Sequence, residues 1–113
     1  MRAKYTVWLV ILIAGCSSTG DIIMTRKPTF QATTSKLDTT YVSCVLAHWK
    51  KLSPDAHMLE FSNGFEVVVP RGATGTEELL LVRSQANGAD VTLYEWIEVL
   101  ALRGYRESAH DCL

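Results

Sequence analysis

The chain has no apolar run long enough to cross a membrane. Its longest such stretch, residues 5–13, is well short of the roughly 20 apolar residues that a transmembrane helix needs. A retained membrane-spanning helix is therefore disfavoured. A cleaved, secretory-type leader at this position is favoured instead.

Concentrated positive charge is also missing. The chain has 11 Lys and Arg residues against 12 Asp and Glu residues, and its formal net charge is −1. The basic residues form isolated pairs, such as Arg26-Lys27 and Lys50-Lys51, instead of a stripe. Binding to the phosphate backbone of nucleic acids requires clustered Lys and Arg. The sequence therefore predicts no nucleic-acid partner.

Motifs for catalysis are absent as well. There is no Gly-x-Ser-x-Gly, and residues 72–76 lack the Gly-Lys-Ser/Thr ending of a phosphate-binding loop. The carboxylates of Asp55, Glu60, Glu66 and Glu95 have no spacing that marks an acid–base pair. We predict a protein that is not an enzyme and that carries no cofactor. The alternative is a small envelope enzyme accessory or a ligand-binding domain.

The N-terminus carries the clearest signal that is present. Arg2 and Lys4 precede the apolar run, and the run ends at Ile13-Ala14-Gly15-Cys16, which is typical of a secretory signal. This tetrapeptide resembles the lipobox of bacterial lipoproteins. The resemblance implies removal of residues 1–15 as a signal peptide and acylation of Cys16. It also implies a bacterial envelope location, and Ser17 in place of aspartate favours the outer membrane, facing the periplasm.

Residues 16–37 are rich in Ser and Thr and poor in large apolar side chains. We interpret them as the lipidated cysteine followed by a flexible tether, because such a composition rarely orders itself. The alternative is that residues 22–24, Ile-Ile-Met, dock on a partner or on the domain itself. The mature chain after residue 15 is long enough for one small domain, which we place at residues 38–113.

Two cysteines, Cys44 and Cys112, remain after Cys16. In a small exported chain an even pair predicts one disulfide, here closing a 68-residue loop (112 minus 44). Such a bond is worth about 4 kcal/mol in the chain-entropy model. A zinc site built from these cysteines with His48 and His110 is the alternative. It is disfavoured because the compartment oxidises thiols and His-x-Cys is not a typical zinc spacing, so we predict no metal site.

The hydrophobic pattern predicts an α+β fold. Apolar residues at three- to four-residue spacing indicate a helix over residues 38–53, capped by Asp38, Thr39 or Thr40. Asn-Gly turns separate strands, and a second helix follows, with a break at Gly104 left open. We expect a four-stranded antiparallel sheet of hairpins with both helices on one face. The expected strands are residues 57–61, 65–69, 78–84 and 90–95, and the expected second helix is residues 97–111.

A further resemblance rests on four features. Cys44 is followed five residues later by Trp49, a Val91-Thr92-Leu93-Tyr94 strand precedes the last helix, and the chain ends in Cys112-Leu113. With the lipobox cysteine, this resembles a group of small proteobacterial envelope lipoproteins of unassigned function. The resemblance implies an anchor at Cys16, Cys44–Cys112 pairing and an α+β layout.

Four aromatic residues, Phe61, Phe65, Tyr94 and Trp96, are candidates for a binding face, because the pattern does not place all of them in the core. We therefore expect a lipid-anchored, non-enzymatic binding or scaffolding module. Its partners would be the membrane, through its lipid, and another envelope protein.

Overall fold

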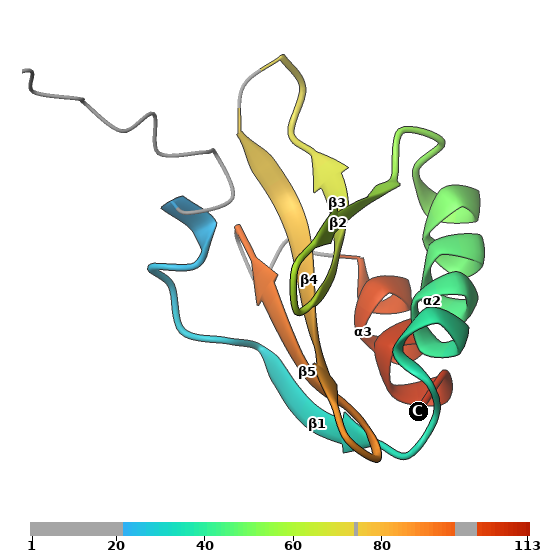
Figure 1. Ribbon diagram of the computed structural model, residues 1–113. Helices are drawn as coiled ribbons and strands as arrows, with labels where there is room; N and C mark the ends of the chain where they lie inside the picture. Colours follow the sequence, from blue (N-terminus) through green and yellow to red (C-terminus); the bar gives the residue numbers. More distant parts are fainter. Residues whose placement is uncertain (1–21, 74, 97–101) are drawn as a thin grey trace, which may run out of the picture.

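The computed structural model describes residues 22–73, 75–96 and 102–113, and shows one five-stranded antiparallel sheet with two helices on one of its faces (Figure 1). The strand order is β1-β5-β4-β3-β2. In chain order the elements are β1 (Phe30–Thr34), α2 (Asp38–Leu52), β2 (His57–Phe61), β3 (Gly64–Pro70), β4 (Thr76–Gln85), β5 (Gly88–Glu95) and α3 (Arg103–Asp111). The predicted α+β class and the placement of both helices on one face are confirmed.

The central strand β4 is buried on both faces, which explains its unbroken Leu-rich sequence. Leu80 and Val82 pack beneath the helices, whereas Leu79 belongs to a second apolar cluster on the opposite face. Successive side chains of a strand point to opposite faces, so a strand covered on both sides loses its polar alternation. The sheet therefore has a helix-covered face and an open face, and the open face is partly apolar.

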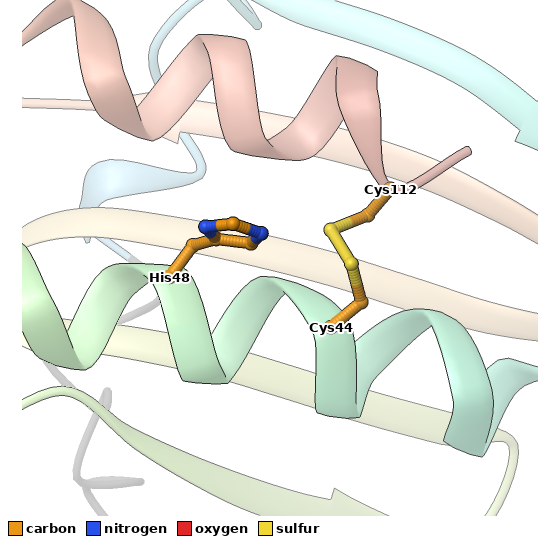
Figure 2. A group of neighbouring side chains, drawn as sticks. All are labelled: Cys44, His48 and Cys112. Atoms are coloured by element: carbon orange, nitrogen blue, oxygen red, sulfur yellow. A yellow bond between two sulfur atoms is a disulfide. The ribbon is translucent and has the colours of Figure 1, made fainter.

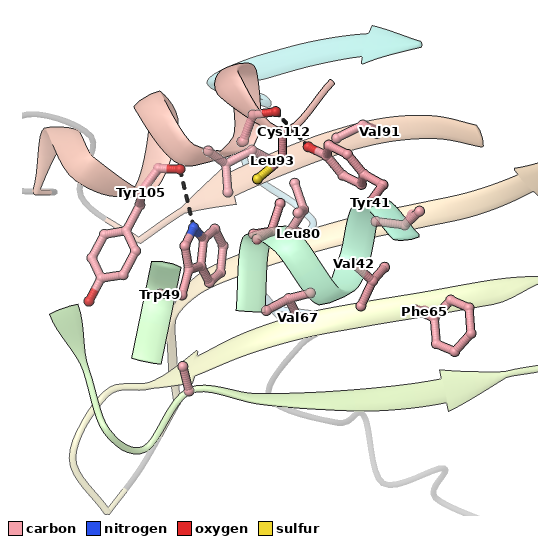
Figure 3. Packing of buried hydrophobic residues seen from close by; sticks show 14 of the residues in the cluster. Tyr41, Val42, Trp49, Phe65, Val67, Leu80, Val91, Leu93, Tyr105 and Cys112 are labelled. Carbon is pink, nitrogen blue, oxygen red and sulfur yellow. Dashed lines mark hydrogen bonds between the residues drawn. The ribbon is translucent and has the colours of Figure 1, made fainter. Parts of the chain in front are cut away.

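Helix α2 supplies the centre of the main core. Tyr41, Val45 and Trp49 recur every four residues, and each is 0% exposed. Their polar ends are satisfied by α3: Trp49 Nε1 donates to the backbone oxygen of Tyr105 at 3.2 Å, and the Tyr41 hydroxyl donates to that of Ala109 at 2.7 Å (Figure 3). Each buried side chain of this size contributes roughly 1.5–3 kcal/mol. Trp49 is therefore a central residue of the core.

The sheet has a fifth strand, β1, where the sequence predicted four strands and a tether. Phe30 pairs with Leu93 and Thr34 with Ala89, so β1 covers the edge that β5 would otherwise expose. Composition was misleading here because the threonines that favour a tether also favour a strand once a neighbouring edge is available. The folded part of the chain therefore begins before residue 38.

Residues 22–26 form a turn that packs on the open face. The backbone N–H groups of Thr25 and Arg26 donate to the carbonyls of Ile22 and Ile23. Ile23 is 0% exposed and lies in one cluster with Val68 and Leu79. Of the two interpretations of residues 22–24, docking on the domain is the one that the structure shows.

The cap of α2 and the start of α3 differ from the prediction, whereas α2 begins at residue 38 as expected. The N-cap position of α2 is Leu37, and Asp38 lies in the first turn, where its carboxylate accepts the N–H of Thr39 and suits the helix dipole. The expected helix over residues 97–111 is not continuous, because Leu102 has extended backbone angles and α3 begins at Arg103. Residues 97–101 lie outside the described part. Gly104, the expected break, lies inside α3 against the Leu52 side chain of α2.

Both predicted Asn-Gly turns are present, and the second also makes room for β1. A Cβ on Gly88, whose φ is +144°, would lie 1.9 Å from the carbonyl oxygen of Thr34. We expect Gly88→Ala to lower the free energy of unfolding by about 3 kcal/mol, because backbone would have to move. Urea denaturation measures this loss.

Gly72→Ala is the matched control. Gly72 has a φ of +57°, but no atom lies within 4 Å of a Cβ built there. The control should lose only about 1 kcal/mol, the cost of a left-handed conformation. Equal losses in the two variants would contradict the close packing of β1 against the β4–β5 turn.

Candidate functional site

The predicted Cys44–Cys112 disulfide is present and joins α2 to the end of α3 (Figure 2). The two Cα atoms lie 5.9 Å apart, within the normal range for a disulfide. Cys112 is buried and Cys44 is half-buried, because Cys44 lies beside the apolar stripe of α2. The bond is part of the packing between the two helices.

His48 approaches this bond, but the four-ligand zinc alternative is not assembled. The ligand atoms of Cys44, His48 and Cys112 lie within 4.8 Å of one another, as expected for residues four apart on one helix face. His110 faces elsewhere: its Nδ1 lies 3.2 Å from Asp111, and its ring lies against Phe30. The two sulfur atoms are bonded to each other and so offer no thiolate ligands. Cys44 and Cys112 therefore form a covalent link between α2 and the end of α3, with His48 beside it.

Sequence reasoning missed a buried pair of acidic residues under α3. Glu78 of β4 and Glu95 of β5 are directly opposite in the strand register, and they are 0% and 2% exposed. Arg106 of α3 lies over them, with its Nε 2.7 Å from Glu95 Oε1. Glu95 was a candidate carboxylate without a partner. Its partner could have been found only from the β4–β5 register, which places both residues on the helix-covered face.

The environment of this pair keeps Glu78 protonated. Burial raises the pKa of the Glu78 carboxyl to about 10, and the hydrogen bond to Glu95 and the charge of Glu95 act in the same direction. The Arg106 guanidinium opposes this shift. Within the described residues, no N–H or O–H group donates to either oxygen of Glu78. A proton on Glu78 lets it donate to Glu95, so one negative charge remains to pair with Arg106.

The open face carries a shallow cavity of about 640 Å³ over β1, β5 and β4. Its lining is about equally polar and apolar, and its polar residues include Gln31 and Thr33 of β1, Arg83 of β4, and Thr92 and Tyr94 of β5. These positions share one face because side chains alternate along a strand and the register aligns them. The cavity lies on the side of the sheet opposite the two helices.

Of the four aromatic residues proposed for a binding face, only Tyr94 lines this cavity. Phe65 is 9% exposed and belongs to the main core, so its assignment to a binding face is wrong. Phe61 is half-buried at the end of edge strand β2. Trp96 packs on the cluster around Ile23. Its ring is also contacted by two guanidinium groups, those of Arg26 and Arg71, each 4.3 Å from the ring centroid.

The remaining candidate carboxylates do not form a common site. Glu60 is opposite Phe65 and Glu66 is opposite Leu59 in the β2–β3 register, so these two side chains lie on different faces of the sheet. Asp55 lies in the loop before β2 and is exposed. These positions give no acid–base pair.

Comparison of the chain with known proteins finds no matching family model, no matching curated protein and no matching solved structure. Neither α2 nor α3 is long and apolar enough to span a membrane, and no other helix in the described part is.

We expect Glu78→Gln to change how stability depends on pH. Because the folded-state pKa of Glu78 is raised, folding takes up a proton, and the resulting stability is present below the unfolded pKa of about 4.5 and is lost as the pH rises toward 10. A neutral amide donates to Glu95 at every pH. The free energy of unfolding of the wild type should therefore fall relative to that of the variant as the pH rises from 5 to 9.

Denaturation of both proteins at several pH values measures this difference. Glu60→Gln, at an exposed position on β2, is the control and should follow the wild type. Parallel curves for wild type and Glu78→Gln would show that Glu78 is charged in the folded protein.

Proposed function

We propose that the protein is a lipid-anchored bacterial envelope protein whose open sheet face binds another envelope protein without catalysing a reaction. In this proposal residues 1–15 are removed and acylated Cys16 holds the domain on the outer membrane, facing the periplasm. The supporting features are the Ile13-Ala14-Gly15-Cys16 motif and the Cys44–Cys112 bond, since disulfides persist in oxidising compartments.

The asymmetry of the sheet carries the binding part of this proposal. Both helices cover one face, while among the described residues the other face is covered at one end, by the turn at residues 22–26. The rest of this face presents amide, hydroxyl, guanidinium and carboxylate groups around Tyr94. A mixed polar surface with an aromatic residue is typical of non-obligate protein interfaces.

The same cavity fits a small ligand less well. Its volume is within the range of ligand sites, but such sites are enclosed and mostly apolar, whereas this one is shallow and only about half apolar. The buried acid pair lines neither this cavity nor the smaller one between α2 and α3. The Ser84 hydroxyl donates to Asp38 but not to a histidine, so this contact is not nucleophile machinery.

A photoactivatable crosslinker at position 92 tests the binding face in intact cells. Thr92 lies in the middle of the cavity lining, so irradiation should give one discrete adduct with another envelope protein. The same crosslinker at position 107, on the exposed side of α3, is the control and should give none.

Charge reversal at the cavity makes this experiment specific. Arg83→Glu alters the lining without touching the core, so it should abolish the adduct from position 92. Asp90 is opposite Arg83 in the strand register, so the new pair of like charges should cost less than about 1 kcal/mol of stability and leave the domain folded. No adduct from position 92, or an adduct that is insensitive to Arg83→Glu, would contradict binding at this face.

A further inference from the structure

The docked N-terminal turn shortens the link between the domain and its proposed lipid. Ile23 is fully buried against Val68 and Leu79, so the domain is fixed to the chain from this point on. The segment from Cys16 to Ile22 is then the link between the lipid and the domain. Its six Cα–Cα steps span at most about 21 Å. If Cys16 is acylated, as proposed above, the end of the domain that carries Ile23 must stay close to the bilayer.

This end of the domain presents cations next to an exposed apolar side chain. Arg26 and Lys27 follow the turn and are exposed, and Ile22 is 51% exposed. Arg71 is exposed on the neighbouring loop between β3 and β4. We call the surface formed by Ile22, Arg26, Lys27 and Arg71 the basic end. Apolar and basic side chains together are the composition of membrane-surface segments.

Trp96 holds two of these cations in place. The guanidinium carbons of Arg26 and Arg71 each lie 4.3 Å from the Trp96 ring centroid. The backbone N–H of Arg71 also donates to the backbone carbonyl of Gly75 at 3.1 Å, and this hydrogen bond closes the loop between β3 and β4. Stacking uses the flat side of a guanidinium and leaves its in-plane N–H groups able to bind phosphate. Two arginines are therefore positioned in advance for phosphate oxygens.

Acidic groups offset this charge. In the described part, Glu77 and Asp55 are exposed acidic residues at this end: the carbonyl of Glu77 accepts the N–H of Trp96, and Asp55 precedes the start of β2, which pairs with the end of β3. Asp21 precedes the turn in the sequence. Phosphate recognition at this end depends on the fixed positions of Arg26 and Arg71 near the anchor more than on net charge.

We propose that the basic end is a membrane-facing surface that binds the phosphate headgroups of anionic phospholipids, with Ile22 entering the interface. This inference rests on the proposed acylation of Cys16. It also fixes an orientation: β5 runs for eight residues, about 27 Å, away from this end. The cavity on the open face then lies to the side of the domain, within reach of a partner on the same membrane.

Quenching in vesicles tests this orientation. The mature, acylated protein is placed on vesicles of phosphatidylcholine alone or mixed with phosphatidylglycerol, each with a headgroup quencher. A fluorophore is attached at Ala73→Cys, beside Arg71, or at Ala86→Cys, in the turn at the other end of β5. Because the link to the lipid is short, we expect stronger quenching at position 73 than at position 86 on both vesicle types. Quenching at position 73 should be several-fold stronger again when phosphatidylglycerol is present. Equal quenching at both positions would overturn the inference.

Charge variants separate headgroup binding from simple closeness. Arg71→Gln and Lys27→Gln should each weaken the binding of this end to the anionic membrane surface, with an equilibrium constant lower by about five-fold. This weakening is measured as reduced quenching at position 73. Lys27→Gln should not change the stability of the fold, because the Lys27 side chain is exposed, so its effect on quenching reports on membrane binding alone. Arg83→Gln, on the open face away from this end, is the control and should change nothing.

Two other outcomes have distinct meanings. Quenching at position 73 that is the same on both vesicle types would overturn headgroup recognition. Failure of the protein to stay on either vesicle would contradict the lipid anchor of the proposed function.

Discussion

The Cys44–Cys112 bond joins the first helix of the domain to the last turn of the chain, and much of the helix-covered face depends on that link. In the chain-entropy model it is worth about 4 kcal/mol, close to the whole net stability of a small domain. With α3 held on α2, Trp49 and Tyr41 find their hydrogen-bond partners in the backbone of α3. The chain end is held as well, because Thr34 and Lys36 donate to the carbonyls of Leu113 and Cys112.

The position of α3 also determines the chemistry of the buried acid pair. Arg106 reaches Glu95 because α3 lies on the face of the sheet to which Glu95 points. One cation beside two carboxyl groups leaves one of them protonated, so the pair carries a single negative charge under the helix. Replacing such a pair with apolar residues can be neutral or stabilising. We interpret the pair as a means of fixing how α3 sits on the sheet.

The two faces of the sheet have different roles: one stabilises the fold, and the other carries the proposed binding surface. The helix-covered face contains the main core, the disulfide and the acid pair. The open face contains the cavity around Tyr94 and, at one end, the turn that buries Ile23. We propose that this turn also sets how the domain stands on the membrane. A long free tether would allow any orientation, whereas a short link favours one.

Sequence patterns predicted the elements whose signal is local. The helical spacing of Tyr41, Val45 and Trp49, the two Asn-Gly turns and the paired cysteines each predicted a feature that the structure confirms. Predictions failed where the deciding partner is distant in the chain. The strand at residues 30–34 needs the edge of β5, and Glu78 needs Glu95 of the next strand.

The candidate binding face shows the same limit. Phe65 and Tyr94 both lie in strand-forming segments, yet one lies in the core and the other lines the cavity. Strand register and the side on which the helices pack decide between them, and the packing side depends on helices that are distant in the chain.

The intact mass of the protein, purified from bacterial membranes without reductant, tests the central claim most directly. The account predicts a chain that lacks residues 1–15, carries acyl chains on Cys16, and is two hydrogens lighter than its reduced form because Cys44 and Cys112 are bonded. A full-length chain of 12.6 kDa with three thiols open to alkylation would contradict both the anchor and the exported state.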